Sequence, residues 1–180
     1  MKTKSRILAF GICLILMLTL SFSVFADGTD EAEEVNTTAG YPTVSAKSYV
    51  LMEATTGQIL SENAADEKLS VTYLTKLMTL LLTIEAIESG KLTLKTEVTV
   101  SSRASSMSSP VIWLNKGEKI TVDELIKSIT IGNANDASVA LAEAVCGNEE
   151  EFVSQMNLKA SQLGMNNTVF KNSTGIDADG

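Results

Sequence analysis

Two kinds of apolar periodicity follow one another along the first half of the chain. Between residues 46 and 53 (AKSYVLME) polar and apolar residues alternate, and after a turn that contains Gly57 the stretch 58–62 (QILSE) continues as a returning strand. From Thr72 the apolar residues recur at helical spacing, and Gly90 closes this segment. The pattern therefore predicts a β-hairpin followed by a helix.

The second half of the chain predicts one further strand and three further helices. The strand covers residues 94–100, and the helices cover residues 121–131, 137–146 and 149–163. Thr121 and Glu124 have the spacing of a capping box at the start of the first of these helices. Residues 101–110 are expected to form a surface loop, and Trp113 and Leu114 are expected to lie in the core. The interleaved elements predict an α/β (α+β) domain.

Residues 1–26 have the pattern of a secretory signal peptide. A positively charged start precedes the apolar run 7–22, and small residues up to Ala26 supply a cleavage point. A retained membrane anchor is the alternative, although the run is short for a spanning helix. Residues 27–40 are acidic and polar, so we expect a flexible leader there. The folded domain of an exported protein is then expected over residues 41–180.

Composition excludes several classes of function. The net charge of −8 leaves no basic stripe that could neutralise the phosphates of a nucleic acid. The chain has no histidine, which removes the Ser-His-Asp and Cys-His mechanisms and the usual zinc sites. After signal cleavage Cys146 is alone, so no internal disulfide can form, and we expect a buried small apolar side chain. Any hydrolase chemistry here needs a lysine or a carboxylate as its base.

The stretch 70–79 (SVTYLTKLMT) has the pattern of an active-site helix in which one residue is exchanged. Lys76 follows Tyr73 at a spacing that brings both side chains to the same side of a helix. A lysine that burial keeps neutral can take a proton from such a neighbour. On spacing alone, however, Lys76 is an ordinary solvated lysine, and Asn133 and Asn135 are ordinary loop and capping residues. Pattern alone predicts only an exported α/β domain with a lysine-bearing helix.

Four stretches, taken in order, resemble the amino-terminal part of the D-alanyl-D-alanine carboxypeptidases, which are low-molecular-mass penicillin-binding proteins. They are residues 51–70 (LMEATTGQILSENAADEKLS), 74–92 (LTKLMTLLLTIEAIESGKL), 113–147 (from WLNKGEK to AEAVCG) and 152–177 (FVSQMNLKASQLGMNNTVFKNSTGID). The resemblance implies the β-lactamase/penicillin-binding-protein-like transpeptidase fold, incomplete at the carboxy terminus. It also implies a serine-type carboxypeptidase that removes the terminal D-alanine of peptidoglycan stem peptides through an acyl-enzyme.

The family places its chemistry in three motifs, S-x-x-K, S-x-N and K-T-G. Lys76 matches the lysine of the first motif, and Tyr73 stands where the family has its nucleophilic serine. Asn133 and Asn135 match the polar positions of the second motif, with Asn133 in place of serine, and the chain ends before any K-T-G. The phenol of Tyr73 is a weak nucleophile at neutral pH, and Asn133 cannot relay a proton as a hydroxyl does. Thr72 is a further candidate nucleophile.

Three functions stay open at this point. The first is a carboxypeptidase of cell-wall biogenesis, impaired by Tyr73 and by truncation. Ser70 is a second substitute nucleophile in that case. The second function is a non-catalytic relative that binds peptidoglycan peptides or a cell-wall partner. The third is a β-lactamase, which would need a carboxylate to activate the deacylating water.

The resemblance also implies partners and a place in the cell. The peptidoglycan stem peptide is the expected partner, and β-lactams are expected to bind if the site works. The expected location is the extracytoplasmic face of the bacterial membrane or cell wall, with membrane-surface association if a carboxy-terminal anchor exists. No metal and no organic cofactor is implied. Without the remaining strands of the family's sheet, the opening hairpin is expected to expose an unpaired edge and an apolar face.

Overall fold

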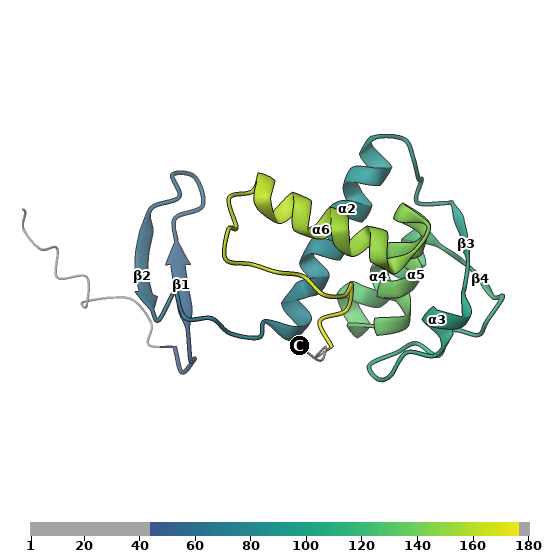
Figure 1. Cartoon of the computed structure of the whole chain (residues 1–180), viewed down its shortest axis with the longest axis horizontal. Coiled ribbons are helices and arrows are strands. Elements are labelled where there is room, and N and C mark those ends of the chain that lie inside the picture. Colours follow the sequence, from purple (N-terminus) through teal and green to yellow (C-terminus); the bar gives the residue numbers. More distant parts are fainter. Residues whose placement is uncertain (1–43, 177–180) are drawn as a thin grey trace, which may run out of the picture. The chain divides into compact units, whose positions relative to one another are not determined.

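The computed structural model describes residues 44–176, so the predicted signal peptide and leader lie outside the described residues. The described chain divides into two units, one that ends at Glu67 and one that begins at Lys68 (Figure 1). In chain order the elements are β1 (Tyr49–Met52), β2 (Ile59–Asn63), the 3-10 turn η1 (Thr72–Leu74), α2 (Thr75–Glu88), β3 (Glu97–Thr99), α3 (Ser102–Ser105), β4 (Lys119–Thr121), α4 (Val122–Gly132), α5 (Asn135–Cys146) and α6 (Glu149–Gln162). The mixture of helices and strands agrees with the predicted α+β class.

The first unit is the predicted β-hairpin. β1 and β2 pair antiparallel, with Tyr49 opposite Asn63. In the turn, the Glu53 carboxylate accepts hydrogen bonds from Thr55 and Thr56, which lower the pKa of Glu53 to about 2. Apolar side chains on the two strands are exposed, as expected for a two-stranded sheet (Val50, Leu51, Met52 and Ile59).

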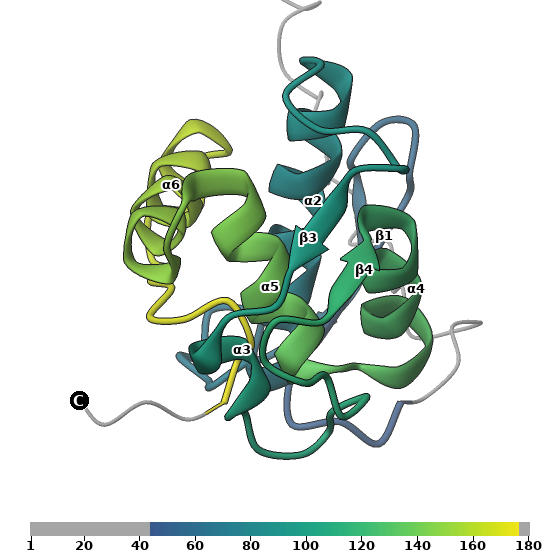
Figure 2. The ribbon, with the colours of Figure 1, turned by 90° about the vertical axis from the view of Figure 1, so that its right-hand side faces the viewer.

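The second unit is built around α5. This helix packs against α2, α3, α4, α6 and β3, and Figure 2 shows β3 and β4 side by side in the same unit. The α5 side chains are mostly small, which lets the neighbouring helices approach closely, and Ala137, Ala140 and Ala142 are completely buried. Larger side chains from the neighbours, such as Leu125 and Phe152, complete the core. Each such buried side chain contributes about 2 kcal/mol through the hydrophobic effect.

The ends of several helices are set by capping residues that can be recognised in the sequence. The Thr121 side chain accepts from the Glu124 amide, and the Glu124 carboxylate accepts from the Thr121 amide, so the predicted capping box is confirmed. Asn148 caps α6 through its side-chain oxygen. Gly147 ends α5 with a φ of 87°, a left-handed conformation that glycine adopts without strain. Among the described residues, no helix has both the length and the apolar character that crossing a membrane requires.

Several local predictions were wrong. Residues 101–110 contain the short helix α3, which Ser101 caps by accepting from the Ala104 amide. The strand β4 was not foreseen, because three residues carry too little alternation to reveal a strand. Trp113 is 80 % exposed although its neighbour Leu114 is buried as predicted. Cys146 is only half-buried.

Candidate active site

The start of α2 brings the predicted residues Tyr73 and Lys76 together. Lys76 is only 3 % exposed, whereas Tyr73 in the preceding 3-10 turn is 52 % exposed. The Lys76 Nζ lies 4.8 Å from the centre of the Tyr73 ring, in a cation–π contact. It also donates a hydrogen bond of 2.8 Å to the carbonyl oxygen of Thr174. Within the described chain the Tyr73 hydroxyl has no hydrogen bond, so the contact between the two side chains is made through the ring.

Burial gives the amine of Lys76 the character of a base. It lowers the pKa of Lys76 from 10.5 to about 8, because the buried ammonium loses its hydration. The Thr174 carbonyl and the Tyr73 ring both favour the charged form and oppose part of this effect. At neutral pH a fraction of the Lys76 amine is therefore neutral, which a proton acceptor requires.

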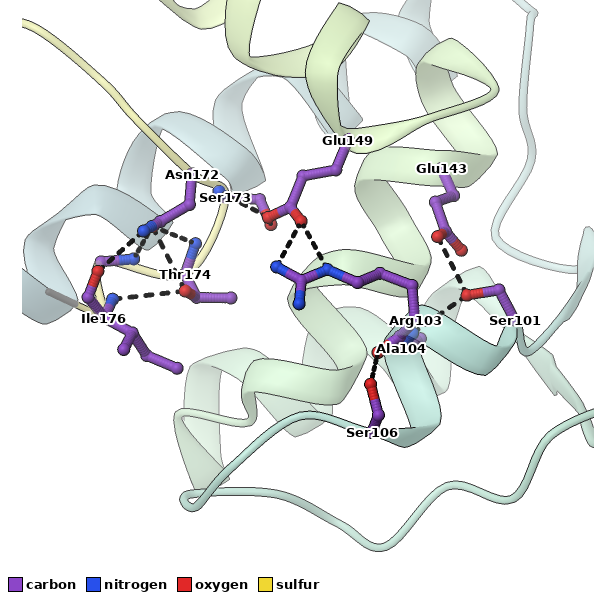
Figure 3. A network of polar contacts seen from close by, with 11 residues as sticks. Ser101, Arg103, Ala104, Ser106, Glu143, Glu149, Asn172, Ser173, Thr174 and Ile176 are labelled. Carbon is purple, nitrogen blue, oxygen red and sulfur yellow. Dashed lines mark hydrogen bonds and ion pairs between the residues drawn. The ribbon is translucent and has the colours of Figure 1, made fainter. Parts of the chain in front are cut away.

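The segment that carries Thr174 is a compact turn held by Asn172. The Asn172 side-chain oxygen accepts from the amides of Thr174 and Gly175, and its nitrogen donates to the carbonyl of Ile176 (Figure 3). A Cβ at Gly175 would lie 1.8 Å from the Thr72 carbonyl oxygen, so only glycine fits there. The turn is thereby packed directly on the residues that begin η1.

The two asparagines of the second predicted motif lie between α4 and α5. Asn133 ends α4 in the left-handed conformation, with a φ of 53°. Asn135 is buried at the start of α5, and its side-chain nitrogen donates to the carbonyl of Ser108. Its side-chain oxygen is buried without a hydrogen-bond partner. In the described chain no hydrogen bond joins either asparagine to Lys76.

Asp136, the residue after Asn135, holds the backbone of residues 112–114 in place. Its carboxylate accepts from the backbone amides of Ile112 and Leu114 at 3.1 Å each. It also accepts from the amide of Ala137, which places the negative charge at the beginning of α5. The segment 112–114 is therefore tied to the same helix that carries Asn135.

A cavity of 390 Å³ lies beside the first turn of α2. Its lining comes from the segment before α2 and from the turn around Asn172 (Leu69, Ser70, Val71, Thr72, Thr75, Val169, Phe170, Lys171, Asn172, Gly175 and Ile176). The volume is within the range of small-molecule sites. Ser70 and Thr72, the substitute nucleophiles considered from sequence, line this cavity, whereas Lys76 and Tyr73 do not.

Sequence reasoning missed Thr174, which contacts Lys76 directly, and Glu149, which contacts the neighbouring Ser173. Thr174 offers only its backbone carbonyl to Lys76, and no side-chain pattern can reveal such a contact. Glu149 is an acidic residue at a helix start, a position that is ordinarily solvated, yet it is 8 % exposed and bonded to Arg103 and Ser173.

Comparison with known proteins decides the family. A family model described as D-alanyl-D-alanine carboxypeptidase matches residues 35–180. The chain belongs to this family. The carboxypeptidase DacF of Bacillus subtilis is 42 % identical over 177 residues, which are 97 % of this chain and 43 % of that relative.

Solved structures of a carboxypeptidase and of a penicillin-binding protein agree with this family and confirm the fold class. The crystal structure of the D-alanyl-D-alanine carboxypeptidase DacD from Francisella tularensis has a TM-score of 0.75 at 32 % identity, covering 78 % of this chain and 34 % of that one. Penicillin-binding protein 6B from Escherichia coli has a TM-score of 0.72 at 35 % identity, covering 78 % and 46 %. The chain thus spans less than half the length of these similar proteins.

Proposed function

We propose that this chain carries the part of a serine-type D-Ala-D-Ala carboxypeptidase site that contains the first two motifs, with Tyr73 preventing acyl-enzyme formation. The carboxypeptidase family of the chain supports the substrate class, the terminal D-alanine of peptidoglycan stem peptides. The proposed roles are Lys76 as proton acceptor, Tyr73 in the place of the nucleophile, and Asn133 and Asn135 as groups that orient the peptide. The work of the site belongs to cell-wall biogenesis.

The contact between Tyr73 and Lys76 is the observation on which this proposal depends. An amine can activate a nucleophile only if it reaches the hydroxyl proton. Here the Lys76 Nζ contacts the face of the Tyr73 ring. It donates its hydrogen bond to the Thr174 carbonyl oxygen and not to the Tyr73 hydroxyl. A phenol is also a weak nucleophile at neutral pH and much larger than a serine hydroxymethyl group. Tyr73 therefore covers the base without being activated by it.

The same geometry favours a non-catalytic peptide-binding role as the second candidate. The side-chain oxygen of Asn135 has no partner, and because Asn135 is completely buried, this oxygen can accept from a peptide amide only once the surrounding residues move. A β-lactamase would need a free carboxylate to activate water. In the described site the carboxylate of Asp136 is occupied by three backbone amides, and that of Glu149 is occupied by Ser173 and Arg103. The β-lactamase therefore ranks last.

Intact mass spectrometry with excess benzylpenicillin tests the proposal. Acylation opens the lactam ring without a leaving group, so an adduct adds the whole mass of the antibiotic. We expect no adduct on the natural chain and an adduct on Tyr73→Ser, with Tyr73→Ser/Lys76→Met as the control that removes the base. An adduct on the natural chain would overturn the blocking role, and peptide mapping would identify Tyr73, Thr72 or Ser70 as its site. No adduct on Tyr73→Ser would overturn the acylation site itself.

Peptide binding tests the recognition of the substrate terminus on which the second candidate depends. We expect the natural chain to bind a stem pentapeptide ending in D-Ala-D-Ala more tightly than the same peptide ending in L-Ala-L-Ala, measured by calorimetry. Asn135→Ala should weaken binding of the D-Ala-D-Ala peptide more than binding of the L-Ala-L-Ala peptide, because it removes the unpaired buried acceptor. Equal binding of both peptides would contradict recognition of the D-Ala-D-Ala terminus.

Export and the domain limits are part of the proposal. Residues 1–26 would direct export, residues 27–40 would follow as a leader, and residues 41–180 would form the carboxypeptidase-like domain. The amino-terminal sequence of the protein recovered from cells tests this arrangement. We expect a mature chain that begins at Asp27.

A further inference from the structure

Glu149 is a buried carboxylate whose two oxygens serve different parts of the second unit. It is the first residue of α6 and is 8 % exposed. Its Oε2 accepts from the Nε and Nη2 of Arg103 at 3.2 and 3.1 Å. Its Oε1 accepts from the amide and the hydroxyl of Ser173 at 3.1 and 2.7 Å. Figure 3 shows the Glu149 carboxylate between the guanidinium of Arg103 and the backbone of Ser173.

The backbone that Glu149 holds is the one that contacts α2. The carbonyl of Ser173 accepts from the hydroxyl of Thr79 at 2.7 Å, and the next carbonyl, that of Thr174, accepts from the Lys76 Nζ at 2.8 Å. The amide of Ser173 is thus fixed by α6 while the two carbonyls that follow face α2. A shift of Ser173 would move the Thr174 carbonyl, because a planar peptide bond links the two residues.

We propose that Glu149 is a positioning residue of the candidate site, which holds the Ser173–Thr174 backbone so that the Thr174 carbonyl receives the ammonium of Lys76. The inference rests on the proposed function for its meaning, since it concerns the residue proposed as the base. Arg103 in turn fixes Glu149: by occupying Oε2, it leaves Oε1 for Ser173. A buried carboxylate with two such partners is held in one rotamer.

On the elements that pack against α2, other ionisable groups are bonded to partners other than Lys76 or, like Glu150, are exposed. On α5, Asp136 accepts from backbone amides and Glu143 accepts from Ser101. On α6, Lys159 is paired with Glu85. In the described chain the Lys76 Nζ therefore has the Thr174 carbonyl and the Tyr73 ring as its contacts. The Thr174 carbonyl is its hydrogen-bond acceptor, so its position governs how well the ammonium protons are protected.

Proton exchange at the Lys76 Nζ tests the inference without any need for catalysis. In the nitrogen-15-labelled chain below the pKa of Lys76, the ammonium protons of a buried, hydrogen-bonded lysine exchange slowly, and Lys76→Met identifies their signal. We expect Glu149→Ala to accelerate this exchange about tenfold or more, the factor expected from loss of a hydrogen bond to a charged group. Glu149→Gln, which keeps an acceptor for Ser173, should restore part of the protection. Glu150→Ala, at the exposed neighbouring position, is the control and should change nothing.

A second variant keeps the test decisive if Glu149→Ala does not fold. Ser173→Ala removes the shorter of the two hydrogen bonds to Oε1 and leaves α6 intact, so a several-fold acceleration is expected. Exchange rates equal to that of Glu150→Ala in every folded variant would overturn the positioning role. Loss of protection together with no benzylpenicillin adduct on Tyr73→Ser would sustain this inference and reject the proposed function. An adduct on Tyr73→Ser together with unchanged protection would sustain the proposed function and reject this inference.

Discussion

At the scale of single residues, the buried amine of Lys76 makes the stability of the fold depend on pH. Its pKa is about 8 in the folded chain against an ordinary 10.5, so between these values the unfolded chain binds a proton that the folded chain does not. The destabilisation is fully present below about pH 8 and is relieved as the pH rises through 10.5. We expect the natural chain to gain about 3 kcal/mol relative to Lys76→Met over this rise, measured by denaturant unfolding.

The control for this experiment is an exposed lysine. Lys95→Met changes the same functional group at the surface and should leave the dependence of unfolding on pH unchanged. If the natural chain and Lys76→Met gave parallel curves, the amine of Lys76 would be as well hydrated in the folded chain as in the unfolded one.

Gly175 offers a residue-scale test of the turn that contacts Lys76. Gly175→Ala would place a Cβ 1.8 Å from the Thr72 carbonyl oxygen, and both backbones would have to move. Gly164 has nearly the same φ, +74° against +77°, but nothing within 4 Å of the added carbon. We expect Gly164→Ala to cost about 1 kcal/mol from its dihedral angle alone, and Gly175→Ala at least about 2 kcal/mol more. Equal losses in thermal unfolding would contradict the close approach.

At the scale of elements, Asp136 joins α5 to the segment before it. Asp136→Asn keeps the shape of the side chain but replaces one acceptor oxygen with a donor nitrogen. An amide of Ile112 or Leu114 then loses its hydrogen-bond acceptor. The expected cost is about 2 kcal/mol of unfolding free energy. The matched control, Asp123→Asn, removes an exposed ion pair with Lys127 and should cost less than about 0.5 kcal/mol. A smaller loss at Asp136 than at Asp123 would contradict this role.

Most helices were predictable because their signals are local. The capping box at Thr121 and the glycine that ends α5 fix helix boundaries through neighbouring residues, and the structure begins α4 and ends α5 there. The strand β4 and the exposure of Trp113 were not predictable. β4 exists through its pairing with β3, and the backbone position of residues 112–114 depends on the distant carboxylate of Asp136. Such features depend on contacts between elements, which periodicity does not contain.

At the scale of the whole molecule, the two units differ in how many of their side chains are buried. Residues 44–67 contain no buried side chain, whereas α5 is buried along most of its length. A two-stranded sheet is marginally stable in water, so we expect hairpin amides to exchange with opening free energies near zero. Amides of α5 should exchange only through global unfolding, with about 5 kcal/mol or more. Hydrogen exchange followed by peptide mass spectrometry measures both, and equal protection would contradict the expectation.

The site shows the same division between local and distant information. Lys76, Tyr73, Asn133 and Asn135 could be proposed from sequence because a motif is a short string, and the structure brings the first two into contact. Glu149 could not be found, because an acidic residue at a helix start is ordinarily solvated. Its role depends on Ser173 reaching it from the other end of α6.

The exposure of Trp113 determines how this protein can be observed. It is the only tryptophan of the chain, and most of its indole is already in water in the folded state. Its emission should therefore be close to that of the unfolded chain and readily quenched by acrylamide. Global unfolding would pass almost unseen by intrinsic fluorescence and would have to be followed by circular dichroism. A binding partner that covers residues 112–114 would instead shift the emission to shorter wavelength, which makes Trp113 a built-in reporter of occupancy.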